Sequence, residues 1–159
     1  MSSSTPATPT QSLEKLQIVL PDAPKPVASY VPARQSGNLV YISGQIPMAS
    51  GSLLATGAVP SQVSIEQAIE CARQCTLNCL ANLQNHLGDL GKVTKVVRVG
   101  VFVASDPGFG SQPQIANGCS DLLVEIFGES VGQHARAAVG VSALPLDVPV
   151  EIEFIFEVE

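Results

Sequence analysis

The sequence predicts an α+β protein in which a single mixed β-sheet carries two α-helices packed on one face. Three observations predict this fold class. Two long segments repeat apolar residues at helical spacing, shorter segments show the alternation or uniform apolarity of strands, and the elements follow in the order βββαβαββ. The 159 residues contain no internal repeat and no long inner linker, so we expect one domain around one core.

The composition narrows the class of protein. Hydrophobic residues make up 45% of the chain and charged residues 14%, a balance typical of globular proteins. The net charge of −6 provides no cationic surface for a phosphate backbone, which disfavours nucleic acid as a partner. Gly, Pro and polar residues interrupt the uncharged stretch between Arg34 and Glu66, so we expect no membrane-spanning segment.

The first residues differ from the rest of the chain. Residues 1–12 are rich in Ser, Thr and Pro and are predicted to form a disordered tail, while residues 13–159 are predicted to form the single domain. Neither a secretory signal nor an Arg-rich transit signal is visible. Four cysteines without a secretory context favour free thiols. Together these features favour a cytoplasmic location.

The first half of the chain contains a meander and a long helix. Extended segments are expected at residues 16–20, 28–33 and 39–46, followed by an uncharged loop over residues 47–62. The spacing of Ser64 and Gln67 is that of a capping box, which predicts where the first helix begins. The apolar stripe that follows ends at Gly88, a residue suited to a left-handed helix cap.

The second half alternates strands with one more helix. Residues 96–103 are too apolar to alternate, which predicts a strand in the middle of the sheet. Pro113 begins the second helix and Gly128 ends it. Strands over residues 136–144 and 148–158 complete the chain. The tight turn between them predicts that they pair antiparallel with each other.

The central strand also predicts self-association. Strict alternation places Val96 and Phe102 on one side of the sheet. The other side then receives four valines: Val97, Val99, Val101 and Val103. Because two helices cover only one face, an apolar face is left open, and we predict a homo-oligomer that buries it.

Arg136 is the first candidate binding residue. Residues on the same side of its predicted strand are small, namely Ala138, Gly140 and Ser142, which leaves space beside the guanidinium. The rigid fork of donors on an arginine matches a carboxylate in two parallel hydrogen bonds. A structural ion pair with a glutamate of the neighbouring strand is the alternative, and from spacing alone it is the commoner role.

The last strand supplies a candidate carboxylate. Apolar residues alternate there with Glu151, Glu153, Glu157 and Glu159. Such a face is usually just solvated, but a carboxylate near a bound substrate can activate water. Antiparallel pairing of the last two strands would bring one of these glutamates onto the same sheet as Arg136.

Other reactive residues favour structural roles. Cys71, Cys75 and Cys79 recur every fourth residue along one helix face, as metal ligands can, but no His, Asp or Glu joins them at a zinc-like spacing. Burial in the core is therefore favoured over a metal site. His134 shares the side of Arg136 if the strand begins early, although a histidine before a strand is more often structural.

Two segments resemble the signatures of a known family. They are Asn38-Leu39-Val40-Tyr41-Ile42-Ser43-Gly44-Gln45-Ile46-Pro47, and Ala135-Arg136-Ala137-Ala138-Val139 continuing through Leu144-Pro145 to Val150-Glu151-Ile152-Glu153. Both resemble the YjgF/RidA family of reactive-intermediate deaminases. The resemblance spans about residue 28 to the C-terminus.

The resemblance implies a fold, an assembly and a reaction. It implies a chorismate-mutase-like protomer, a homotrimer with clefts between subunits, and hydrolysis of 2-imino or enamine acids to 2-keto acids and ammonia without a metal or organic cofactor. By the same resemblance, Arg136 binds the substrate carboxylate and Glu151 positions the attacking water. Further positions that match the pocket of the family are Tyr30, Ser43, Gly44, Asn117 and the backbone of Ala138.

The sequence also departs from the family pattern. His134 stands where short members usually have proline, Ala138 replaces a frequent cysteine, and the loop from Pro47 and the second helix are longer. The chain thus resembles a longer subgroup, and the departures border the expected cleft. Two other functions stay open: a non-catalytic module that binds keto or amino acids, and an endoribonuclease or translation inhibitor, which the acidic composition disfavours.

Overall fold

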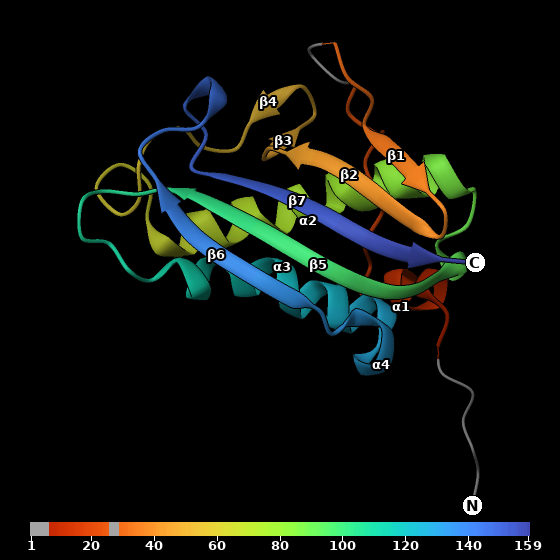
Figure 1. The fold of residues 1–159 in the computed structure, drawn as a ribbon. Helices are drawn as coiled ribbons and strands as arrows, with labels where there is room; N and C mark the ends of the chain where they lie inside the picture. Colours follow the sequence, from red (N-terminus) through yellow and green to blue (C-terminus); the bar gives the residue numbers. More distant parts are fainter. Residues whose placement is uncertain (1–6, 26–28) are drawn as a thin grey trace, which may run out of the picture.

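A five-stranded mixed β-sheet forms the centre of the computed structural model, which describes residues 7–25 and 29–159 (Figure 1). Across the sheet the strands run β1 (Ala33–Ser36), β2 (Leu39–Gln45), β7 (Val150–Val158), β5 (Val93–Ala104) and β6 (Ala135–Val141). Only β5 and β6 are parallel, and the other neighbours are antiparallel. This arrangement confirms the predicted fold class.

Two helices, α2 (Ile65–Leu87) and α3 (Gln112–Phe127), lie behind the sheet and cover one of its faces (Figure 1). The predicted capping box is present, because the Ser64 side chain accepts from the Gln67 amide at 3.1 Å. Gly88 ends α2 with a φ of 81°. The helices pack so closely that a side chain on Gly118 of α3 would lie 2.6 Å from the Ile69 carbonyl oxygen of α2.

The pairing predicted for the last two strands is wrong. Strand β6 pairs only with β5, in parallel, and β5 separates it from β7. The connection contains a short 3-10 helix, η2 (Pro145–Asp147), which bonds to another loop because the Gly57 amide donates to the Asp147 carbonyl at 2.7 Å. The chain therefore crosses over the end of β5 instead of forming a hairpin.

A β-bulge in β5 changes which residues face the helices. Val96 pairs with Phe156 and Arg98 pairs with Ile155, so Val97 is an extra residue between them. The alternation therefore shifts by one position, and a single set of valines is buried under the helices: Val96, Val99, Val101 and Val103. The predicted division of these valines between two faces is wrong, because a bulge breaks strict alternation.

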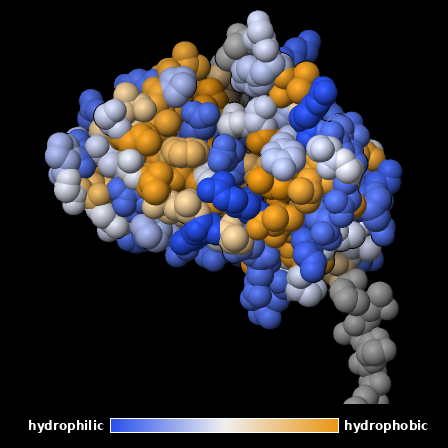
Figure 2. All heavy atoms as spheres, viewed as in Figure 1, coloured by the Kyte–Doolittle hydropathy of each residue, from blue (hydrophilic) through white to orange (hydrophobic). Residues whose placement is uncertain are grey.

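The open face of the sheet is mixed in character. Figure 2 shows hydrophobic areas separated by hydrophilic residues on the side that faces the viewer in Figure 1. The exposed Arg98 and Glu153 form an ion pair there at 3.2 Å. The apolar face that motivated the homo-oligomer is thus only partly apolar, and the oligomer stays a prediction.

The core lies between the sheet and the helices. Phe154 and Phe156 stack within it, with ring centroids 6.0 Å apart. The four cysteines, Cys71, Cys75, Cys79 and Cys119, are free and buried. Burial raises the pKa of the Cys119 thiol to about 12, so this thiol stays protonated and unreactive near neutral pH. The sequence-based assignment of the cysteines to the core is confirmed.

The N-terminal region is more ordered than predicted. Residues 9–12, assigned to a disordered tail, belong to helix α1 (Pro9–Lys15), while residues 1–6 lie outside the described part. A capping box stabilises α1, since the Thr8 side chain accepts from the Gln11 amide at 3.2 Å. Leu13 and Leu16 pack against the core. The prediction of a disordered tail is wrong for residues 9–12, because a helix begins there despite the Ser/Thr/Pro-rich composition of the segment.

Smaller elements complete the chain. Residues 16–20, expected to be extended, do not form a strand. Of the segment expected at residues 28–33, residue 28 lies outside the described part, and the strand begins only at Ala33. The predicted loop contains a hairpin of β3 (Met48–Ala49) and β4 (Ser52–Leu53). The remaining elements are η1 (Leu90–Lys92) and α4 (Glu129–Gly132). Every helix in residues 7–25 and 29–159 is too short or too polar to cross a membrane.

Candidate functional site

The sequence-predicted site residues lie on opposite faces of the sheet. Arg136 of β6 pairs with Val99 of β5, whose side chain is buried under the helices, so both point to the helix face. Glu151 of β7 pairs with Phe102 of β5, on the open face. One chain therefore does not bring Arg136 and Glu151 together.

Helix α3 holds the Arg136 side chain at the edge of the sheet. Its Nη1 donates to Asn117 Oδ1 at 2.9 Å and to Ser120 Oγ at 3.0 Å, and its Nη2 donates to the Pro113 carbonyl at 3.4 Å. Asn117 and Ser120 are three residues apart, which places both on the side of α3 that faces β6. Among the described residues, no carboxylate lies within ion-pairing distance of Arg136. The structural ion pair considered from the sequence is therefore not formed.

The surroundings of Arg136 form the arginine half-site, defined here as Arg136, Asn117, Ser120, His134 and Ala138. Ala138 lies two residues after Arg136 on the same face and is half-buried. A shallow surface depression, lined in part by Ser120, His134 and Arg136, lies beside the guanidinium. A guanidinium that is exposed, oriented and free of a carboxylate partner is suited to bind an anion.

The other predicted residues form the glutamate half-site on the open face, defined here as Glu151, Tyr30, Ser43 and Gly44. They line a pocket of about 580 Å³ together with Ile46, Pro145 and Leu146. The register between β2 and β7 shifts between Ile42 and Gln45, so Ser43 and Gly44 lie in an irregular stretch that opens beside Glu151. The structure thus brings these four residues together.

Gly44 gives the Glu151 carboxylate its space. A side chain on Gly44 would collide with Glu151 Oε1 and would lie 3.0 Å from its Cδ. Ser43 is fixed in a different way, because its hydroxyl donates to the Val31 carbonyl at 2.7 Å. That bond uses the only hydroxyl hydrogen of Ser43, so its oxygen can still accept but its side chain cannot donate to a ligand.

The environment of Glu151 favours its neutral form. Burial raises the pKa of the Glu151 carboxyl above its ordinary value, and the negative charge of Glu153 raises it further. A carboxyl with a raised pKa is better suited to accept and return a proton near neutral pH than an ordinary surface glutamate. The raised pKa therefore makes Glu151 the candidate proton acceptor of the glutamate half-site.

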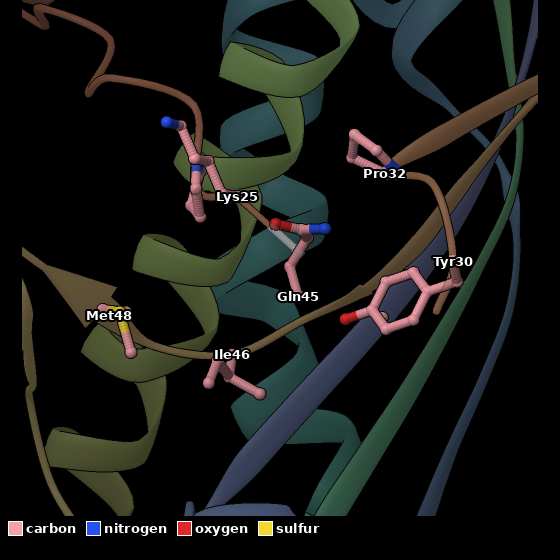
Figure 3. Close-up of a pocket in the computed structure, with 8 residues that line it drawn as sticks. Lys25, Tyr30, Pro32, Gln45, Ile46 and Met48 are labelled. Atoms are coloured by element: carbon pink, nitrogen blue, oxygen red, sulfur yellow. The ribbon is translucent and has the colours of Figure 1, made fainter. Parts of the chain in front are cut away.

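A smaller hollow of about 60 Å³ shares Tyr30, Gly44 and Ile46 with the pocket of about 580 Å³. Figure 3 shows the Tyr30 ring on one side of this hollow and the Met48 side chain on the other. The side chain of Gln45 lies between them and is anchored by Asn82, which donates to Gln45 Oε1 at 3.1 Å.

Sequence reasoning missed Ser120, which contacts both Arg136 and His134. The available signal was its helical spacing from Asn117, since residues three apart share a helix face. The face of α3 that meets β6 could not be assigned without the parallel pairing of β5 and β6.

The protein is thus a small α+β protein with a mixed sheet backed by two helices, an arginine without a carboxylate partner among the described residues at one edge, and a pocket beside Glu151 on the open face. Residues 20–158 match the family model described as Endoribonuclease L-PSP. The chain therefore belongs to this family, the YjgF/RidA family whose signatures its two motifs resemble.

Curated relatives cover most of the chain. Protein TCP17 of Trypanosoma cruzi is 40% identical over 146 residues, which are 92% of this chain and 91% of the relative. A protein of Dermatophagoides farinae named 2-iminobutanoate/2-iminopropanoate deaminase is 33% identical over 143 residues, which are 89% of this chain and 95% of the relative.

Solved structures share the fold. The Agrobacterium tumefaciens protein Atu1372, described as having unknown function, superposes with a TM-score of 0.86 at 44% identity over 93% of this chain and 91% of that one. The YjgF gene product of E. coli superposes with a TM-score of 0.60 at 27% identity over 86% and 93%. Of these two, the Agrobacterium protein has the more similar backbone.

Proposed function

We propose that the protein hydrolyses reactive 2-imino and enamine acids to 2-keto acids and ammonia. The observation that carries this proposal is the division of the site into two complementary halves, one able to bind a carboxylate and the other able to move a proton. The name of the Dermatophagoides farinae relative supports the reaction class. The two halves retain the positions that the family motifs mark as functional.

The proposal requires two copies of the chain. Because β6 is an edge strand and Glu151 lies on the open face, an arginine half-site can complete a glutamate half-site only on another protomer. A closed ring of protomers, such as a homotrimer, repeats this contact with a cleft at every interface. We therefore place the reaction in clefts between subunits of a homotrimer.

In this mechanism Arg136 binds and orients the substrate. Asn117 and Ser120 use both Nη1 hydrogens and the Pro113 carbonyl accepts from Nη2, so the Nε hydrogen and the other Nη2 hydrogen are left for the substrate carboxylate. The substrate reacts as the protonated imine: Glu151 accepts a proton from water as the water oxygen bonds to the imine carbon, and the carbon–nitrogen π electrons move onto nitrogen to give a neutral carbinolamine. Glu151 then returns this proton to the amine nitrogen. The carbon–nitrogen bond breaks with its electron pair leaving on ammonia, and the hydroxyl group loses its proton to water as the keto C=O bond forms. Positioning contributes more than strong chemistry here, because imines already hydrolyse in water.

An oxidase-coupled assay tests the proposal. An amino-acid oxidase generates 2-iminopropanoate or 2-iminobutanoate, and the decay of the imine is followed with and without the protein. We expect acceleration by the wild type and a loss of about tenfold or more in Arg136→Ala, since hydrogen bonds to a charged group contribute about 1.5–3 kcal/mol. Lys15→Ala, which removes an exposed positive charge from α1 outside both half-sites, is the control and should retain activity. The absence of acceleration by the wild type, or equal acceleration by Arg136→Ala, would contradict the proposal.

The description of the family supplies a second candidate, an endoribonuclease. The net charge of −6 weighs against it, because RNA binding depends on cationic surface. Cleavage of RNA that survives stringent repurification and disappears in Arg136→Ala would favour this candidate. Binding of 2-oxobutanoate without imine hydrolysis would instead favour the non-catalytic binding module.

The cytoplasmic location stays a prediction. Matched relatives include proteins named as mitochondrial from Saccharomyces cerevisiae and Schizosaccharomyces pombe.

A further inference from the structure

A chain of hydrogen bonds leads from Arg136 into the body of the protomer. Arg136 Nη1 donates to Ser120 Oγ at 3.0 Å, and Ser120 Oγ lies 2.9 Å from His134 Nε2. The other ring nitrogen, His134 Nδ1, lies 2.7 Å from the Gly132 carbonyl oxygen. Ser120 and His134 are both half-buried, so water competes little for these bonds.

The direction of every bond in this chain follows from its two ends. A carbonyl oxygen can only accept, so His134 Nδ1 carries a hydrogen. In a neutral imidazole Nε2 is then an acceptor, and the Ser120 hydroxyl must donate to it. A guanidinium can only donate, so the Ser120 oxygen accepts from Arg136. Burial, the larger effect, and the charge of Arg136 lower the pKa of His134, while its bond to Gly132 opposes them. The neutral form that this pattern requires is therefore the one present near neutral pH.

We propose that Ser120 and His134 act as a positioning pair that fixes the Arg136 guanidinium for carboxylate binding. By accepting the Ser120 hydroxyl hydrogen, His134 holds that hydroxyl in one rotamer. A lone pair of the Ser120 oxygen then faces Arg136 and accepts a hydrogen bond from Nη1. The orientation of a long, exposed arginine is thus set before the substrate arrives, which lowers the entropic cost of binding. This inference rests on the proposed role of Arg136 as the carboxylate-binding residue.

The alternative role for His134, a general base, does not fit the geometry. Its Nε2 is occupied by Ser120 and its Nδ1 by Gly132. Both nitrogens point into the protomer's own hydrogen bonds, so neither is open to a substrate. His134 therefore acts on the reaction only through Ser120 and Arg136.

A double-mutant cycle tests the positioning pair. Wild type, Ser120→Ala, His134→Ala and the double variant are compared in the imine assay. We expect KM to rise about two- to tenfold in each single variant, the range that a neutral hydrogen bond supplies, with kcat changed less than about twofold. The double variant should resemble Ser120→Ala alone, because His134 has no effect once Ser120 is absent. In His134→Gln the amide oxygen can replace Nε2 as the acceptor, so this variant should recover most of the affinity lost in His134→Ala. It also allows the test to proceed if His134→Ala does not fold.

A second measurement separates this inference from the proposed function. In protein labelled with 15N-arginine, hydrogen bonds at Nη1 slow rotation of the guanidinium group, and we expect faster rotation of Arg136 in His134→Ala than in wild type or His134→Gln. If wild type neither hydrolyses imines nor binds 2-oxobutanoate, the proposed function fails while the rotation rates still decide the positioning role. Unchanged rotation in His134→Ala, or an equal effect of His134→Ala with and without Ser120, would overturn the inference.

Discussion

The contact between Gly44 and Glu151 allows a sharp test of the glutamate half-site. In Gly44→Ala the new methyl group would collide with Glu151 Oε1 and lie 3.0 Å from Cδ and 3.2 Å from Cγ, whereas ordinary contact begins at 3.4 Å. The carboxylate must therefore move by roughly 1 Å to reach a normal separation. A misplacement of about 1 Å at a reacting group can cost about 100-fold in rate, so we expect a loss of that order in kcat/KM.

The same substitution should leave the fold nearly unchanged. Gly44 does not have a positive φ, so alanine can adopt its backbone conformation. A compatible Gly→Ala change gains about 0.4–1 kcal/mol, and an off-rotamer Glu151 costs about 0.5–1.5 kcal/mol. These terms nearly cancel, and Tm should change by less than about 4 °C.

The assay compares kcat/KM and Tm in Gly44→Ala and in a matched control. Gly100→Ala is the control, because its methyl group would lie 2.9 Å from Glu153 Cγ and Oε1 on the same face and would displace a carboxylate outside the half-site. An exposed ion pair contributes at most about 1 kcal/mol, so the control should lose less than about fivefold. Equal losses in both variants, or an unchanged kcat/KM in Gly44→Ala, would refute the role assigned to the Glu151 carboxylate.

Two further predictions concern stability. Because the pKa of Glu151 is raised in the folded protein, its ionised form disfavours folding at neutral pH, and this penalty disappears as the pH falls through the raised pKa. Glu151→Gln should therefore have a higher Tm than wild type at pH 7, and the difference in Tm should be smaller in acid. A Tm below that of wild type at pH 7 would contradict this reasoning. Asn78 of α2 donates to the Ile46 and Met48 carbonyls at 3.0 and 2.9 Å. Asn78→Ala removes both bonds and leaves the Ile46 carbonyl only its bond from the Met48 amide, so it should lower the free energy of unfolding by about 1–3 kcal/mol in urea titrations. The exposed Asn85→Ala should change it by less than about 0.5 kcal/mol, and equal effects would argue against the buried bonds.

Local sequence signals predicted the helices well. The Ser64 and Gln67 capping box and the Gly88 cap depend on residues a few positions apart, and the structure contains both. The same spacing in Thr8 and Gln11 marks the start of α1 and could have been recognised. The Ser/Thr/Pro composition of residues 9–12 is typical of a disordered tail, but the local capping box outweighs it and the segment forms a helix.

Strand pairing could not be predicted in the same way, because it depends on contacts between distant segments. The bulge between Val96 and Arg98 leaves no sequence signal, yet it decides which side chains are buried. Likewise, the turn after β6 suggested a hairpin, but β5 lies between β6 and β7. Both errors concern register and order within the sheet.

The candidate site combines both kinds of information. The resemblance named the residues, and the sequence could not show that Arg136 and Glu151 lie on opposite faces. That arrangement follows from the parallel register of Val99 with Arg136 and the antiparallel register of Phe102 with Glu151. It turns the predicted cleft between subunits into a geometric requirement for the proposed reaction.

Subunit complementation tests this requirement most directly. Arg136→Ala and Glu151→Ala chains are inactive alone in the proposed mechanism, but a mixed ring restores a cleft wherever one neighbour supplies Arg136 and the other supplies Glu151. Random assembly of equal amounts restores about one cleft in four, so co-expressed chains should recover about a quarter of wild-type activity. Activity no higher than that of either variant alone, in oligomers shown by native mass spectrometry to contain both chains, would contradict a site shared between subunits.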